Sequence, residues 1–243
     1  LRKQAVFSAW ERLFFSKGET AMQYKAAIFD LDGTLINSLE DLADSANAVL
    51  SAYHFPTYAA EKYRYFVGNG TQKLIERILP PHQAEDAAFV HRFMAEYKER
   101  YAENLLHKTI PYDGIMEMLE ELCRRGIPLA VCTNKHQSAA ERIITALFPP
   151  RMFREIIGDR EGLPRKPDPT KVLHIMKEFG VTGQETAYFG DSSVDMDTAR
   201  NAETLAVGVL WGFRTEQELR EHGADVLLNT PMEIFEKVTF RES

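Results

Sequence analysis

The apolar positions of this chain form short unbroken runs separated by longer helical stretches, and the first run sets the pattern. Residues 26–29 are apolar throughout and lead into Asp30, Asp32 and Gly33. A run of this length fits a strand buried on both faces, and Gly33 allows a sharp turn after it. Open α/β sheets bind ligands beyond the carboxyl ends of their strands. The two carboxylates therefore mark a candidate site.

From Pro111 onward, helical and strand-like segments alternate regularly. The helical pattern covers 114–125, 138–148, 169–179, 194–202 and 216–222, and the strand-like runs cover 127–132, 155–157, 186–189, 205–210 and 226–228. Strands that alternate with helices in this way form βαβ units. We therefore expect an α/β fold, a doubly wound parallel sheet with helices on both faces.

The stretch between the first strand and Pro111 has helical patterns and no convincing strand. Ser38 and Asp41 resemble an acidic helix start, and further helices are expected over 59–66, 71–79 and 83–104. This stretch indicates an inserted helical domain. The expected division is an N-terminal extension at 1–21, an α/β core at 22–36 and 109–243, and the helical insert at 37–108.

An aromatic stripe, Phe93, Tyr97 and Tyr101, recurs every four residues on the last of these helices. Helices that pack against a core need such a stripe, so we interpret it as a packing face rather than a ligand site.

Composition narrows the possible partners. The chain has 243 residues, 44% hydrophobic and 27% charged, which is typical of a globular protein. Its net charge of −7 gives no electrostatic reason to expect nucleic acid or an anionic membrane as a partner, and no apolar run is long enough to span a membrane. Any phosphate would have to be met by a local site, for which a bound cation is the obvious device.

The two cysteines, Cys123 and Cys132, lack the close spacing of redox or zinc sites. We expect both to be buried free thiols, which suits a reducing cytosol and a cytoplasmic location.

Polar residues follow several of the expected strands. They are Asp30 and Asp32 after the first, Thr133 and Asn134 after the second, Asp159 after the third and Asp191 after the fourth, with Lys166 held between turn-forming residues before a proline. Acidic oxygens clustered without His or Cys suit Mg²⁺ rather than zinc. Carboxylates, a cation, a lysine and a hydroxyl are what phosphoryl transfer requires.

These motifs resemble the haloacid dehalogenase superfamily, on its phosphatase side. Asp-x-Asp-Gly-Thr-Leu at 30–35 is similar to the first motif of the family, Thr133 to the second, Lys166 to the third, and Gly-Asp-x-x-x-Asp at 190–195 to the fourth. Each later motif is weak alone, but the four together are specific. The helical insert is similar to the C1 cap of the family. Asn37 departs from the pattern, since close relatives often carry Asp there.

The resemblance implies a mechanism for the carboxylate pair. Asp30 would attack the phosphorus and form an aspartyl phosphate, a route open to a carboxylate nucleophile. Asp32 would protonate the leaving alkoxide and then activate water. A halide leaving group would have no use for that acid, so a dehalogenase is disfavoured.

The resemblance also implies a set of metal and phosphoryl ligands. Mg²⁺ would be held by the Asp30 side chain, the Asp32 backbone carbonyl and Asp191, with Asp195 in reserve or behind the direct ligands, and Thr133, the Asn134 amide region and Lys166 would hold the phosphoryl oxygens. Three alternatives stay open. Asp195 could only cap the helix after Asp191, Thr133 could be an ordinary strand end, and Lys166 could be a solvated surface lysine.

Within the expected cap, residues 64–71 resemble the substrate loop of phosphoglycolate phosphatases. Gly68 and Gly70 would let backbone amides approach a substrate, and Arg64 or Lys73 could answer a carboxylate. Together with Asn69, these residues form the expected substrate-binding set of the cap.

The leading hypothesis is a Mg²⁺-dependent phosphatase that acts on a small phosphorylated metabolite, with phosphoglycolate favoured, as a monomer or homodimer. A sugar-phosphate mutase, a pyrophosphatase and a nucleoside monophosphate phosphatase share the same core and remain alternatives. A non-catalytic binding module is the alternative outside enzymes, although such a chain would be expected to have lost at least the nucleophile.

Overall fold

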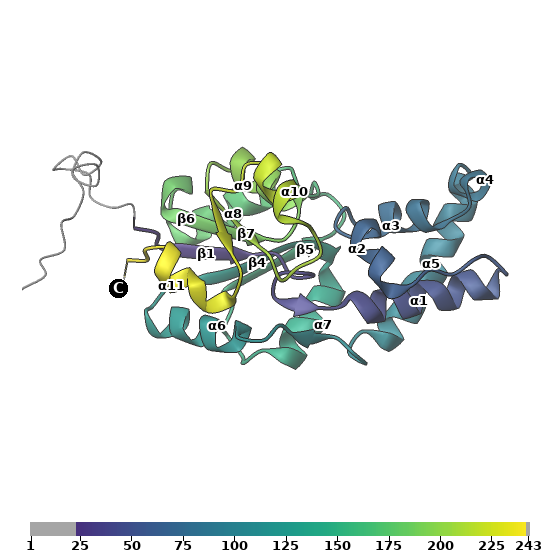
Figure 1. Ribbon diagram of the computed structural model, residues 1–243, viewed down its shortest axis with the longest axis horizontal. Coiled ribbons are helices and arrows are strands. Elements are labelled where there is room, and N and C mark those ends of the chain that lie inside the picture. Colours follow the sequence, from purple (N-terminus) through teal and green to yellow (C-terminus); the bar gives the residue numbers. More distant parts are fainter. Residues whose placement is uncertain (1–22, 242–243) are drawn as a thin grey trace, which may run out of the picture.

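The computed structural model describes residues 23–241, so the extension expected at 1–21 lies outside the described residues. A six-stranded parallel sheet in the order β5-β4-β1-β6-β7-β8 forms the core (Figure 1). The strands are β1 (Ala26–Phe29), β4 (Leu129–His136), β5 (Glu155–Asp159), β6 (Thr186–Gly190), β7 (Leu205–Val209) and β8 (Val226–Leu228). The first strand of the chain is therefore central, because β1 pairs with both β4 and β6.

Helices cover both faces of the sheet (Figure 1). One face carries α6 (Ile115–Arg124), α7 (Gln137–Leu147) and α11 (Ile234–Lys237), and the other carries α8 (Thr170–Phe179), α9 (Ser193–Asn201) and α10 (Glu216–Glu221). Side chains of β1 alternate between the two cores, since Ala27 and Phe29 join the first and Ile28 joins the second. The predicted doubly wound parallel sheet is confirmed.

The inserted helices form a second body at one end of the sheet (Figure 1). They are α1 (Leu39–Ala52), the 3₁₀ helix η1 (Ala60–Lys62), α2 (Tyr63–Phe66), α3 (Thr71–Ile78), α4 (Pro81–Ala84) and α5 (Ala87–Asn104). Two short antiparallel strands, β2 (Ile36–Asn37) and β3 (Ile110–Pro111), pair where the chain leaves and re-enters the core. We call the helical body the cap. The domain boundaries at 36/37 and 108/109 stay an interpretation of this arrangement.

A buried carboxylate fixes the base of the cap. Asp41 on α1 accepts hydrogen bonds from the backbone N–H of Thr109 at 2.9 Å, from the Thr109 hydroxyl at 2.7 Å and from the Lys108 N–H at 3.0 Å. Asp41 thus ties the outgoing connection to the returning one.

Four details differ from the expectations. The helix expected at 83–104 is broken, because Asp86 accepts from the N–H groups of Ala88 and Phe89 and starts α5 anew. The β2 and β3 strands were not expected, because two residues each are too few to show a periodic pattern. The Ser38 side chain makes no helix-capping bond. Cys123 is exposed, although Cys132 is buried as expected, and both thiols are free.

Within residues 23–241, no helix is both long and apolar enough to cross a membrane.

Candidate active site

The carboxyl ends of β1, β4 and β6 meet beneath the cap at a cavity of about 240 Å³. Predicted site residues that line this cavity are Asp30, Asp32, Gly68, Gly70, Thr133, Asn134 and Asp191. The parallel strands deliver the core residues to one edge of the sheet, as expected for such folds. Lys166 and Asp195 are buried next to Asp30 without lining the cavity.

Three buried carboxylates form the acidic part of the site. Candidate ligand oxygens of Asp30, Asp191 and Asp195 all lie within 4.8 Å of one another. Burial raises the pKa of Asp30 to about 6, and burial together with Asp195 raises the pKa of Asp191 well above its ordinary value. Apart from its ion pair with Lys166, Asp30 Oδ1 accepts no hydrogen bond within the described residues. Oxygen ligands of this kind, with too few cations around them, fit a divalent cation.

Two glycines make room for Asp191. A Cβ atom on either Gly33 or Gly212 would lie 2.3 Å from the Asp191 side chain, and Gly33 also has a φ of +86°. The backbone N–H of Phe213 donates to Asp191 Oδ2 at 2.7 Å. The sharp turn expected after β1 is therefore also the place where Asp191 packs against the first motif.

Lys166 bridges two of the carboxylates. Its Nζ lies 2.8 Å from Asp30 Oδ1 and 2.6 Å from Asp195 Oδ1, and only 1% of its side chain is exposed. Burial alone would lower the pKa of Lys166, but the charges of Asp195 and Asp30 outweigh burial and raise it. The lysine therefore stays charged beside Asp30 and is not a solvated surface residue.

Asp195 combines a capping bond with a contact to the site. Its Oδ2 accepts from the Ser192 N–H at 3.1 Å and from the Ser192 hydroxyl at 2.6 Å, which caps α9. Its Oδ1 accepts from Lys166 Nζ at 2.6 Å. Both oxygens of Asp195 are thus occupied by protein donors.

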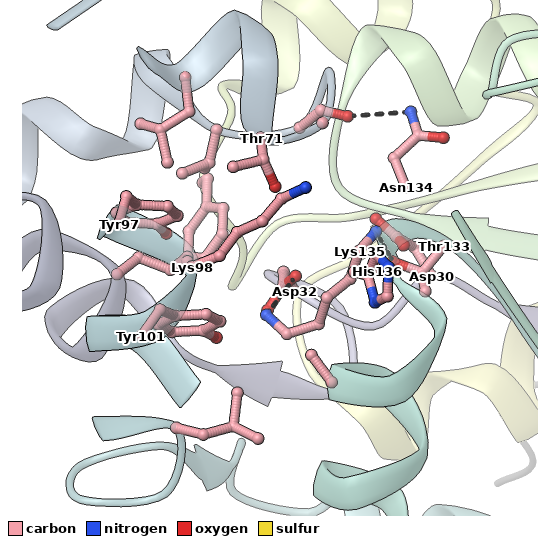
Figure 2. Close-up of a pocket in the computed structure, with 18 of the residues that line it drawn as sticks. Asp30, Asp32, Thr71, Tyr97, Lys98, Tyr101, Thr133, Asn134, Lys135 and His136 are labelled. Carbon is pink, nitrogen blue, oxygen red and sulfur yellow. Dashed lines mark hydrogen bonds and ion pairs between the residues drawn. The ribbon is translucent and has the colours of Figure 1, made fainter. Parts of the chain in front are cut away.

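Asp32 lies in a different environment from Asp30. Its two carboxylate oxygens accept from Lys135 Nζ at 2.8 and 2.9 Å, and Oδ1 also accepts from the Ser38 hydroxyl. The Lys135 ammonium lies 4.8 Å from the centre of the Tyr101 ring on α5. Asp32 is therefore held by a cation that also contacts the cap (Figure 2).

Lys135 was not among the expected site residues because the second core strand was expected to end at Cys132. β4 continues to His136, with a register shift after Cys132, and Lys135 is buried. Side chains two residues apart in a strand share a face. A longer strand would have grouped Lys135 with Thr133.

Asn134 joins the third motif to the cap. Its Oδ1 accepts from the Lys166 N–H at 2.9 Å, and its Nδ2 donates to the Lys166 carbonyl at 3.1 Å. The Nδ2 also donates to the Gly68 carbonyl at 3.2 Å, the dashed line at Asn134 in Figure 2. The Asn134 side chain is thus committed to protein partners. Its position makes the approach of the cap loop depend on the same residue that positions Lys166.

The expected substrate loop contributes its glycines to the cavity. Gly68 and Gly70 both line the cavity and both have positive φ angles, +104° and +86°. Asn69 does not line the cavity, and its Oδ1 accepts from Arg77 at 2.8 Å.

The two cap cations expected to meet a carboxylate are directed elsewhere. Arg64 donates to the carbonyl of Gly212 at 3.3 Å, which links the cap to the core. Lys73 is exposed and pairs with Glu76 at 2.6 Å. Neither side chain lines the cavity.

The aromatic stripe on α5 packs and also faces the site. Phe93, Tyr97 and Tyr101 are all buried in the core cluster, as a packing stripe should be. Tyr97 and Tyr101 line the cavity as well (Figure 2). At another expected strand end, Asp159 pairs with Arg165 at 2.8 Å and does not line the cavity.

Comparison with known proteins agrees with this geometry. The family model for haloacid dehalogenase-like hydrolases matches residues 27–209. The chain is 35% identical to a phosphoglycolate phosphatase of Mesorhizobium japonicum over 195 residues, which cover 80% of this chain and 86% of that protein. It is 34% identical to a phosphoglycolate phosphatase of Pseudomonas putida over 193 residues, which cover 78% of this chain and 70% of that protein.

A solved structure gives the same result for the fold. The crystal structure of a predicted phosphoglycolate phosphatase from Haemophilus somnus superposes with a TM-score of 0.80 at 29% identity, covering 89% of this chain and 98% of that one. The chain therefore belongs to the haloacid dehalogenase-like hydrolases, among the phosphatases of that family.

Proposed function

We propose that this chain is a Mg²⁺-dependent phosphatase that hydrolyses a small phosphate monoester through an aspartyl-phosphate intermediate, with 2-phosphoglycolate as the favoured substrate. The observation that carries the proposal is the pairing of Asp30 with Lys166 and of Asp32 with Lys135 along one cavity. Two carboxylates from one strand end thus have separate cations and can take separate roles.

Asp30 is the nucleophile in this proposal. One of its oxygens attacks the phosphorus and displaces the alkoxide, and the neighbouring Lys166 offsets the charge of the carboxylate and of the incoming phosphoryl group. Thr133 assists from β4. Its oxygen accepts from the Lys135 N–H at 3.2 Å, so its own hydroxyl hydrogen is available for a phosphoryl oxygen.

Asp32 is the general acid and then the general base. It gives a proton to the leaving alkoxide, and the resulting carboxylate takes a proton from the water that attacks the aspartyl phosphate. Lys135 and Ser38 hold the Asp32 side chain in one orientation on the cavity wall. Protonation of an alkoxide is required for ester hydrolysis, which is why two carboxylates are needed.

The acidic cluster is the proposed magnesium site. Asp30 and Asp191 would hold the ion together with the backbone carbonyl of Asp32, while Asp195 keeps Lys166 in place. When bound, Mg²⁺ supplies positive charge against the buried carboxylates and the transferring phosphoryl group.

The cap limits the size of the substrate. It covers the cavity, and the Asn134 bond to the Gly68 carbonyl joins it to the core. Exclusion of water favours transfer to Asp30 over side reactions. A cavity of about 240 Å³ admits a small ester, and the names of the similar proteins support phosphoglycolate.

The test is phosphate release from 2-phosphoglycolate with Mg²⁺ and with a chelator, for the wild type and Asp30→Asn. We expect release only with the metal, and a loss on the order of 10⁴-fold or more in the variant because the nucleophile is gone. A thermal melt of Asp30→Asn confirms folding. Equal activity of the two proteins would refute the mechanism, and conversion of a sugar phosphate without phosphate release would indicate a mutase.

A further inference from the structure

Among the described residues that line the cavity, Lys98 is the cation whose side chain has no protein partner, whereas Arg214 has one although its Nη1 donates no hydrogen bond. Its cationic lining comprises Lys98, Lys135, Arg142 and Arg214, apart from His136. Lys135 is paired with a carboxylate, and the two arginines donate to backbone carbonyls of the cap at 3.2 and 3.0 Å. Within residues 23–241, Lys98 makes neither a hydrogen bond nor an ion pair.

The Lys98 side chain points into the cavity. Figure 2 shows it extending from α5 along the cap side of the cavity, whose lining also includes Thr71 and Asp32. Its neighbours on the same helix, Tyr97 and Tyr101, are buried and line the same wall. The exposed lysine is therefore a cation on a side of the cavity that also carries two tyrosines.

The position of Lys98 corresponds to the leaving group rather than to the phosphoryl group. In the proposed mechanism the phosphorus lies at Asp30 and the leaving oxygen lies at Asp32. The remainder of the substrate must then extend toward the cap, where the wall is largely apolar. An ammonium group beside such a wall interacts most strongly with an anion, since charge-assisted hydrogen bonds are the strong ones.

We propose that Lys98 is a specificity-determining residue that binds a negative charge at the far end of the leaving group. The substrate class is then phosphate monoesters whose alcohol carries a carboxylate or a second phosphate. This inference rests on the proposed function, because it takes the phosphoryl position from Asp30. Both classes share a small anion at the far end of a two-carbon alcohol, with the carboxylate carbon two bonds and the second phosphorus four bonds from the leaving oxygen.

The experiment compares three phosphate esters of two-carbon alcohols. They are 2-phosphoglycolate, 1,2-ethanediol bisphosphate and the uncharged-end analogue 2-hydroxyethyl phosphate. Lys98→Met should lower kcat/KM for the preferred anionic ester by about tenfold to a hundredfold and change the hydroxyethyl ester by about twofold or less. Whichever anionic ester loses more identifies the anion as carboxylate or phosphate. Lys98→Arg should retain most of the preference.

Lys73→Met is the matched control. Lys73 is an exposed cap lysine that does not line the cavity, so its removal changes the cap charge equally without touching the site. We expect the same ratio of anionic to neutral turnover as in the wild type. An equal loss for all three esters in Lys98→Met, or no loss, would overturn the inference.

Failure of the inference can be told from failure of the proposed function. If Asp30→Asn abolishes phosphate release from every ester while Lys98→Met leaves the ratio unchanged, only the inference about Lys98 is wrong. If the wild type releases phosphate from none of the three esters, the proposed function and the inference fail together.

Discussion

The cavity is lined on one side by core residues at the strand ends, the core wall, and on the other side by cap residues, the cap wall. The charged side chains on the two walls differ in whether they have partners. On the core wall, Lys135 pairs with Asp32, and Asp30 is backed by the buried Lys166, which also pairs with Asp195. On the cap wall the lining is mostly apolar, and the exposed Lys98 has no partner within the described residues.

This difference separates the chemistry from the choice of substrate. Charges on strands and their adjoining loops, locked by partners, are oriented before a substrate arrives, which is what electrostatic catalysis requires. A charge without a partner contributes only when a ligand supplies the opposite charge. Variants of the core wall should therefore affect all esters alike, and variants of the cap wall should distinguish among them.

Among the variants that test this comparison, Lys135→Met should lower the activity most. Loss of this cation leaves Asp32 with Ser38 as its remaining donor, so kcat should fall about a hundredfold, as expected when a general acid is mispositioned. KM should change little. Steady-state kinetics on 2-phosphoglycolate and 2-hydroxyethyl phosphate measure both constants.

Lys135→Arg should recover part of the activity because it keeps a donor for Asp32. A loss confined to the carboxylate ester would contradict the division between the two walls, since Lys135 would then contribute to the choice of substrate.

Most of the core could be predicted because its strands are short apolar runs buried on both faces. The run at 26–29 corresponds to β1, and the helix expected at 169–179 corresponds to α8 within one residue. The expected strand after Gly126 was too short, because Thr133, Asn134 and Lys135 are polar although β4 buries them. Polar pattern alone does not distinguish a buried functional strand from a loop.

The site was predictable where a residue follows directly from a strand and not where the cap places it. Asp30, Thr133 and Asp191 reach the cavity because parallel strands end at one edge. In the cap, Arg64 and Lys98 are both exposed cations on helices. The residues around them in the sequence do not show which of the two faces the cavity. Which of them faces the cavity depends on how the cap packs on the core, which local periodicity does not specify.

The next largest effect is expected for the pH dependence of Mg²⁺ binding to the buried carboxylates. The pKa of Asp30 is raised to about 6 by burial, so the folded metal-free protein holds a proton there at pH 5 and has mostly released it at pH 7. Because Mg²⁺ binds ionised carboxylates, its apparent affinity should rise at least about tenfold between about pH 5 and pH 7. Isothermal titration calorimetry at several pH values measures this change.

Asp30→Asn should reduce that pH dependence, and Lys73→Met should leave it intact, since Lys73 pairs with Glu76 on the cap and not with a member of the acidic cluster. An affinity that does not vary with pH would show that the three carboxylates do not need a proton or a metal ion to balance their charge.

The smallest effect is expected for Arg64→Ala, which tests a hydrogen bond between the cap and the core. Arg64 donates to the Gly212 carbonyl at 3.3 Å, while Arg214 of the core donates to the Val67 carbonyl of the cap at 3.0 Å. Losing one such hydrogen bond should weaken closure by about 0.7 kcal/mol and raise KM about threefold for carboxylate and neutral esters alike. Steady-state kinetics on both esters measure the change.

Arg214 provides the counterpart for this measurement, because Arg214→Ala removes the reciprocal bond from the core side. If both arginines act only in closure, the two variants share the sign of the KM change and keep the ratio of the two esters. A loss in Arg64→Ala that falls on 2-phosphoglycolate alone would instead mean that Arg64 leaves the Gly212 carbonyl to bind the carboxylate. The specificity role would then belong to Arg64, and the unpartnered charge of Lys98 would have no part in the choice of substrate.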